Sequence, residues 1–104
     1  MADRLDDDAI AHMLKSLNGW TRSADGKAIE KTFRFANFSA AFGWMTRAAM
    51  KAEQLNHHPE WFNVYNRVEV RLTTHDQDGL TNLDQRLAVA MDKMAAETAS
   101  KQGG

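Results

Sequence analysis

Apolar residues recur at helical spacing in three stretches of the chain. The first extends to an Asn-Gly pair that suits a helix end: Leu5, Ile10, Met13, Leu14 and Leu17, then Asn18-Gly19. The second follows two candidate N-caps, Asn37 and Ser39, and extends to about Leu55: Phe38, Phe42, Met45, Ala49 and Ala52. The third follows a T-x-x-D cap formed by Thr81 and Asp84: Leu83, Leu87, Met91 and Met94. This spacing places each series on one face, so it predicts three amphipathic helices whose apolar faces enter the core.

Alternation of side chains predicts strands in two other stretches. Asp25-Gly26, a pair typical of tight hairpin turns, lies between Trp20 and the alternating series Ile29, Lys31, Phe33 and Phe35. From Trp61 to Thr74 the chain alternates again, with one apolar set: Val64, Val68, Val70 and Leu72. Asn66-Arg67, near the middle of this stretch, fits a turn, a bulge or plain strand, so the pattern leaves open whether it forms one strand or two.

Helices and strands in this order predict an α+β fold, a two-layer sandwich in which an antiparallel four-stranded sheet is covered on one face by about three helices. We expect one domain over residues 1–97 and a frayed tail over 98–104, the segment TASKQGG. An open sheet edge around the segment TFRF or around Trp61–Thr74 would favour pairing with another chain.

The composition limits which reactive groups and binding partners the chain can have. There is no cysteine among the 104 residues, which excludes disulfides and cysteine-ligated metals and leaves histidines, carboxylates and hydroxyls as reactive groups. Lys and Arg number 13 against 14 Asp and Glu, so the basic footprint of a nucleic-acid binder is missing. We find no stretch resembling a membrane span or a signal peptide, and we expect a soluble, cytoplasmic protein.

Three of the four histidines lie in LNHHPEWFNVYNRVEVRLTTH, residues 55–75. Glu53 and His57 are four residues apart, so the carboxylate reaches the imidazole if His57 still lies on the last helical turn, where the helix dipole also favours imidazolium. His58 precedes Pro59, which forces an extended backbone and sends its side chain in another direction. Adjacent histidines therefore rarely share a metal, and no H-E-x-x-H pair is present. The alternative is structural, with the double histidine as a helix stop and His75 as a turn residue.

The segment AEQLNHHPEWFNVYNRVEVRLTTHDQDGLTNLD, residues 52–84, resembles the signature of the pterin-4a-carbinolamine dehydratase family, the group that includes the dimerization cofactor of a homeodomain transcription factor. The resemblance is carried by the double histidine before Pro-Glu-Trp, by the block Phe62–Asn66, and by Thr74-His75 followed by Gly79-Leu80. It extends over nearly all residues from about Leu5 to Ala96. Gln77-Asp78 and Leu83 depart from residues common in animal members.

The resemblance implies dehydration of 4a-hydroxytetrahydropterin to quinonoid dihydropterin, without a metal or organic cofactor, in the recycling of pterin after aromatic amino-acid hydroxylation. The family's active-site histidines match His57, His58 and His75. In the family, the histidines that match His57 and His75 are associated with proton delivery, and the one that matches His58 is associated with substrate binding. The family's other site residues match Glu53, Trp61 and Asp84.

Several alternatives stay open. Asp84 also suits position N3 of a capping box after Thr81, and Trp61 also suits packing against the sheet. A binding module acting through a helical face is the second hypothesis, because family members in animals bind a transcription factor in this way. Here the closing helix, with Leu87, Met91 and Met94, could serve a partner or a homodimer or homotetramer. A metal-dependent hydrolase is the third.

Overall fold

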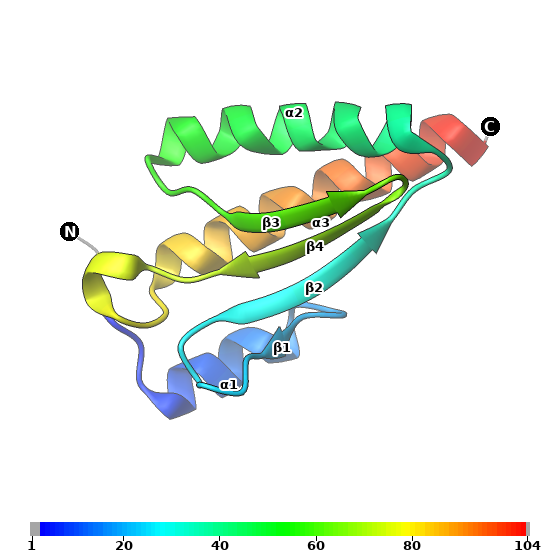
Figure 1. The fold of residues 1–104 in the computed structure, drawn as a ribbon. Helices are drawn as coiled ribbons and strands as arrows, with labels where there is room; N and C mark the ends of the chain where they lie inside the picture. The colour runs from blue at the N-terminus through cyan, green and yellow to red at the C-terminus, as the bar shows by residue number, and fades with distance from the viewer. Residues whose placement is uncertain (1–2, 104) are drawn as a thin grey trace.

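A computed structural model describes residues 3–103 of the chain, with the side chains of residues 3–99. Three helices and a four-stranded antiparallel sheet form two layers (Figure 1). The elements in chain order are α1 (Asp7–Lys15), β1 (Thr21–Arg22), β2 (Ile29–Arg34), α2 (Phe38–Leu55), β3 (Glu60–Val64), β4 (Arg67–Leu72), the short 3₁₀ helix η1 (His75–Gln77) and α3 (Asn82–Gly103). The predicted α+β sandwich is confirmed.

The sheet has the strand order β1-β2-β4-β3. The ambiguous stretch forms two strands, because Tyr65 adopts a left-handed conformation (φ 51°) and reverses the chain before β4 begins at Arg67. Strand β3 is therefore an edge. The other side of β2 is paired with β1 only at Ile29 and Glu30, so the second half of β2, which includes Thr32–Arg34, has no second partner strand among the described residues. The two segments that the sequence suggested as open sheet edges, TFRF and Trp61–Thr74, thus both contain strand residues without a second partner strand in the described part of the chain.

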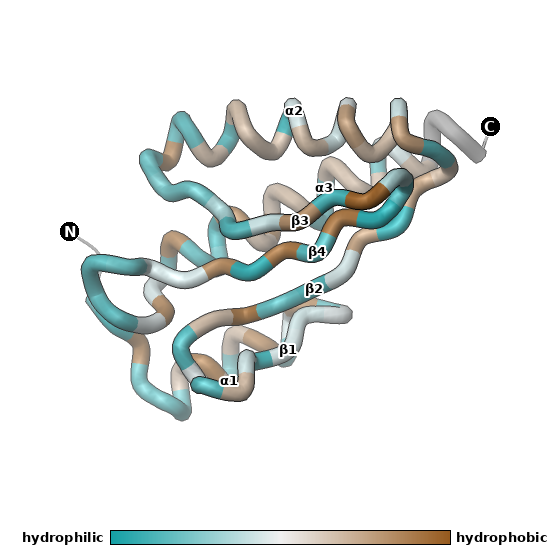
Figure 2. Tube along the Cα trace, viewed as in Figure 1, coloured by the Kyte–Doolittle hydropathy of each residue, from teal (hydrophilic) through white to brown (hydrophobic). Residues whose placement is uncertain are grey.

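Alternate residues of the central strands are buried under the helices. Hydropathy alternates along β4 in the same way (Figure 2). Val68, Val70 and Leu72 are buried on this side, beside Ile29 and Phe33 of β2. Most charged and polar side chains of the same strands lie on the opposite face; Lys31 is an exception, because it lies on the helix-covered side and pairs with Asp92 of α3 (2.8 Å). A core on one side of the sheet is the reason why the alternation was readable in the sequence.

The helix α2 and its Asn37 cap are confirmed, but the prediction of which face of α2 enters the core is wrong. The residues of α2 that enter the core are Ala40, Ala41, Trp44, Ala48 and Ala52. Ala52 alone among them was predicted, Met45 is half-buried, and Phe38, Phe42 and Ala49 are exposed. Both sets have helical spacing, and the fold selects the one whose alanines let α2 approach closely while Trp44 fills the remaining space. The Trp44 indole N–H donates to the Met91 carbonyl oxygen of α3 (3.0 Å).

The other two helices follow their predicted faces. Asp6 caps α1 by accepting from the Ala9 N–H (2.8 Å), and the helix ends at Lys15, before the Asn-Gly pair. In α3, Leu87 and Met91 are fully buried. These two residues therefore do not form the interface considered for the closing helix. The α3 backbone is helical through Gly103, Gly104 lies outside the described residues, and the fraying expected from residue 98 stays a prediction.

Neighbouring alanines of α2 test which face is buried. We expect Ala48→Leu to lower the free energy of unfolding by about 1–3 kcal/mol, because the added carbons have no space in the core. Ala49→Leu, one residue away and exposed, should change it by less than about 0.5 kcal/mol. Urea unfolding of both variants gives the comparison, and equal losses would contradict the orientation of α2 described here.

Candidate active site

The predicted site residues lie around one end of the sheet, where the C-terminus of α2, the start of β3, η1 and the start of α3 come together (Figure 1). Antiparallel pairing of β3 with β4 places Glu60, the first residue of β3, opposite Arg71, near the end of β4. Chain positions before β3 and after β4 are thereby brought to the same place. This arrangement brings His75 to the end of the sheet where the double histidine lies.

His57 does not lie on the last turn of α2. The helix ends at Leu55, and Asn56 takes the left-handed conformation (φ 49°) that commonly terminates helices, so the chain turns away. The His57 ring is buried, and its Nε2 lies 2.6 Å from Oδ1 of Asp84, on the first turn of α3. The predicted pairing of Glu53 with His57 is therefore wrong. The Asn after the last apolar residue of the helix was the signal for this turn.

Asp84 is fully buried and serves two functions that the sequence presented as alternatives. Its Oδ2 accepts from the Thr81 backbone N–H (2.9 Å), the contact that the predicted cap of α3 requires of this carboxylate, while the Thr81 hydroxyl accepts from the Leu83 N–H (3.2 Å). Oδ2 also accepts from the Thr74 hydroxyl (2.9 Å), and that hydroxyl also bonds the Thr81 hydroxyl (2.8 Å). The other oxygen, Oδ1, faces His57. The cap and the histidine contact are thus made by one carboxylate.

This network indicates which nitrogen of His57 carries the proton. A carboxylate surrounded by an N–H and a hydroxyl donor accepts only, so the partner of Oδ1 must donate. We therefore assign the proton to Nε2 from the hydrogen-bond pattern. Among the described residues none hydrogen-bonds Nδ1, which leaves that nitrogen available for a substrate.

The other two imidazoles are also paired through Nε2. His58 lies 2.8 Å from Glu53, and both side chains are exposed. His75 lies 2.7 Å from Oε2 of Glu60, with 70% of its side chain exposed. Glu60 was not among the predicted site residues, although it follows the double histidine and proline directly. Only the pairing of β3 with β4 shows that it reaches His75.

Trp61 points to the helix-covered side of the sheet. It pairs across β3 and β4 with the buried Val70, and its ring lies 6.2 Å from that of Trp44, centroid to centroid. The alternative considered for Trp61 was packing against the sheet, and its side chain does pack against the core on this side of the sheet. A role for Trp61 in substrate binding stays a prediction.

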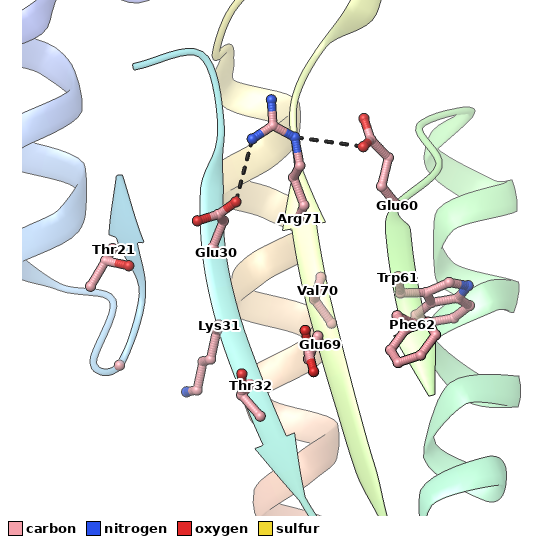
Figure 3. Close-up of a pocket in the computed structure, with 11 residues that line it drawn as sticks. Thr21, Glu30, Lys31, Thr32, Glu60, Trp61, Phe62, Glu69, Val70 and Arg71 are labelled. Atoms are coloured by element: carbon pink, nitrogen blue, oxygen red, sulfur yellow. Dashed lines mark hydrogen bonds and ion pairs between the residues drawn. The ribbon is translucent and has the colours of Figure 1, made fainter. Parts of the chain in front are cut away.

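A hollow of about 650 Å³ lies on the open face of the sheet, over β2, β4 and β3 (Figure 3). Glu60 and Arg71 lie at one end of it, and none of the three histidines is among its lining residues. Arg71 extends between Glu30 and Glu60, and its Nη2 lies 3.0 Å from Asp25. Partial burial lowers the pKa of Arg71, but hydrogen bonds and charges from Asp25, Glu30 and Glu60 outweigh burial and raise the pKa above its ordinary value.

Within the described part of the chain, no group of three or more His, Asp or Glu side chains is arranged to hold a metal ion. No helix there is both long and apolar enough to cross a membrane.

Comparison with known proteins identifies the family. The family described as pterin 4 alpha carbinolamine dehydratase matches residues 3–94. The chain belongs to this dehydratase family. This membership confirms the resemblance seen in the sequence and the predicted class of enzyme, a dehydratase.

Similar proteins support the same assignment. A Rhizobium johnstonii protein, provisionally named pterin-4-alpha-carbinolamine dehydratase, is 58% identical over 94 residues, which is 90% of this chain and 93% of that protein. A Sinorhizobium fredii protein with the same provisional name is 56% identical, covering 90% of each chain. The crystal structure of the transcriptional coactivator/pterin dehydratase from Brucella melitensis has a TM-score of 0.88 and 46% identity, over 89% of this chain and 99% of that one.

The dual role of Asp84 predicts a large effect of its removal. Asp84→Ala leaves the Thr81 N–H and the His57 ring without their buried acceptor, so the free energy of unfolding should fall by at least about 2 kcal/mol. Glu53→Ala removes an exposed carboxylate from an exposed histidine and should cost less than about 1 kcal/mol. Chemical denaturation measures both, and a small effect of Asp84→Ala would contradict the buried network.

Proposed function

We propose that this chain dehydrates a 4a-hydroxytetrahydropterin to the quinonoid dihydropterin by histidine acid–base catalysis, and that it serves pterin recycling. The observation that carries the proposal is the set of three imidazoles at one end of the sheet. Each has its Nε2 held by a separate carboxylate, at 2.6, 2.8 and 2.7 Å, which leaves each Nδ1 without a partner among the described residues. Three oriented imidazoles with one available nitrogen each suit proton transfer to and from a small ring.

The reaction is an elimination of water. The C4a–oxygen bond breaks while the hydroxyl receives a proton, and a ring nitrogen loses its proton as its lone pair forms a double bond to C4a. One proton is given and one is taken, so no net proton, electron or phosphate is consumed. An acid and a base that titrate near neutrality are sufficient, and histidine supplies both.

The environments of the three histidines differ in a way that suits different roles. We assign proton transfer to His57 and His75, and substrate binding to His58. His57 is buried and rigidly held, whereas His75 is mostly exposed and can exchange protons with water between turnovers. Glu53, Trp61 and Asp84 are assigned to substrate binding, with Asp84 acting by holding His57. A cytoplasmic location remains a prediction from the sequence.

A direct assay tests the activity. Purified protein given 4a-hydroxytetrahydrobiopterin should accelerate formation of the quinonoid product, followed by absorbance. We expect His75→Ala to lower kcat by about 10²–10⁴-fold because an acid–base group is lost, and His57→Ala to have an effect of the same order.

The fourth histidine provides the matched control. His12 is exposed on α1, a helix that carries none of the predicted site residues, so His12→Ala should leave kcat unchanged. Unchanged kcat in both His57→Ala and His75→Ala would contradict histidine catalysis. Loss of activity on treatment with a chelator would favour the metal-dependent hydrolase instead.

We also propose that the chain forms a homo-oligomer through the exposed face of α2, and that a second copy of the chain is the partner of this face. Phe38 and Phe42 are 48% and 54% exposed with ring centroids 5.6 Å apart, and Met50 is 64% exposed. Large apolar side chains gathered on one exposed helix face are typical of association surfaces. This face takes the place of the one first considered on the closing helix, whose Leu87 and Met91 are in the core.

A charge on the exposed face of α2 should disrupt the oligomer. Sedimentation velocity of Phe42→Glu should show a monomer where the unchanged protein sediments as a dimer or tetramer, because a carboxylate cannot be buried unpaired in an apolar interface. Lys15→Glu on α1 is the control and should leave the assembly intact. A monomeric unchanged protein at every concentration would contradict the proposal.

A further inference from the structure

We propose that Glu60 is a positioning residue for His75, and that Arg71 holds Glu60 in place for this purpose. The proposal rests on the proposed role of His75 in catalysis. It assigns a role to a carboxylate that is not among the site residues implied by the family resemblance and that the proposed mechanism does not use. Glu60 contacts His75 through one oxygen, Oε2, at 2.7 Å, and Arg71 through the other, Oε1, at 3.5 Å from Nε.

His75 has the most exposed side chain of the three histidines. The side chain of His75 is 70% exposed. The residue lies in η1, a 3₁₀ helix of three residues whose N-cap residue, Thr74, makes no side-chain cap hydrogen bond. An isolated exposed ion pair at this position would be worth at most about 1 kcal/mol, because two flexible side chains must be ordered to make it. Glu60 orients His75 effectively only if Glu60 itself is already ordered.

Arg71 provides that order. Its guanidinium bonds Asp25 in the β1–β2 turn at 3.0 Å and approaches Glu30 of β2 at 3.4 Å, so it is anchored by residues outside β3. Figure 3 shows Arg71 lying between Glu30 and Glu60 across the three strands. Asp25 stays ionised as an anchor, because the Ser23 hydroxyl, the Lys27 backbone N–H and Arg71 hold its pKa well below the usual range. A guanidinium fixed by two carboxylates restricts the third, Glu60, and through it the ring of His75.

The position of Glu60 in the sheet fits this role. Glu60 lies directly opposite Arg71 in the β3–β4 register, on the open face, so the contact between them follows from strand pairing. Glu69 lies on β4 and faces the same side as Arg71, but it pairs with Arg67 at 3.0 Å and bonds neither His75 nor Arg71. It therefore provides a matched control.

Motion of the His75 ring tests the proposal without any assay of activity. In protein labelled with ¹³C at the histidine rings, ¹³C relaxation should give the His75 ring an order parameter of about 0.8 in the unchanged protein and below about 0.6 in Glu60→Ala. Arg71→Met should give an intermediate value, and Glu69→Ala should give the unchanged one. An ordered His75 ring in Glu60→Ala would overturn the proposal.

Kinetics add a second, independent measurement. Glu60→Ala should lower kcat about tenfold with little change in KM, well short of the loss expected when a whole acid–base group is removed. In a His75→Ala background the same substitution should have no further effect, because the group that Glu60 positions is absent. A full additional tenfold loss in that background would also overturn the proposal. A loosened ring in a protein without dehydratase activity would instead contradict the proposed function alone.

Discussion

The buried carboxylate of Asp84 is the interaction on which the site depends. An ionised carboxylate without exposure to water is costly unless donors surround it, and here the Thr81 N–H, the Thr74 hydroxyl and His57 do so. The positive end of the α3 dipole adds to this stabilisation. The three donors come from three segments: His57 follows α2, Thr74 follows β4, and Thr81 precedes α3. Their hydrogen bonds to one carboxylate therefore fix these segments relative to one another. The site is therefore built from the same contacts that close the fold.

The three imidazole–carboxylate pairs differ in their surroundings more than in their geometry. The pair of His57 and Asp84 is buried and connected to two hydroxyls, the pair of His58 and Glu53 is exposed, and the pair of His75 and Glu60 is exposed but connected to Arg71. Burial and connection to a network reduce the rotamer freedom of a side chain, whereas exposure leaves it. A reaction that moves one proton to the substrate and another away from it benefits from both a fixed donor or acceptor and one in contact with water.

The open face of the sheet is connected to the site through Arg71. The helix-covered face supplies the core. On the other side, Arg71 pairs with Asp25, Glu30 and Glu60, and Glu60 pairs with His75. Such exposed pairs contribute little to stability individually. Their effect here is geometric, because Arg71 joins the β1–β2 turn, β2, β4 and the first residue of β3. The hollow on this face adjoins the site at Glu60 without being lined by the histidines.

Local sequence determined the elements and named most residues of the candidate site. Periodicity gave the helices and strands, the Thr81–Asp84 spacing predicted the capping box, and the double histidine before proline identified the family. These features depend on neighbours along the chain, so a sequence can show them. The tertiary structure decided which of two helical faces of α2 is buried, since packing volume and not spacing selects Trp44 over Phe42. It also decided which carboxylate holds which imidazole. His57 finds Asp84 because Asn56 ends the helix in a left-handed turn, and His75 finds Glu60, fifteen residues away, only because the β3–β4 register places them together.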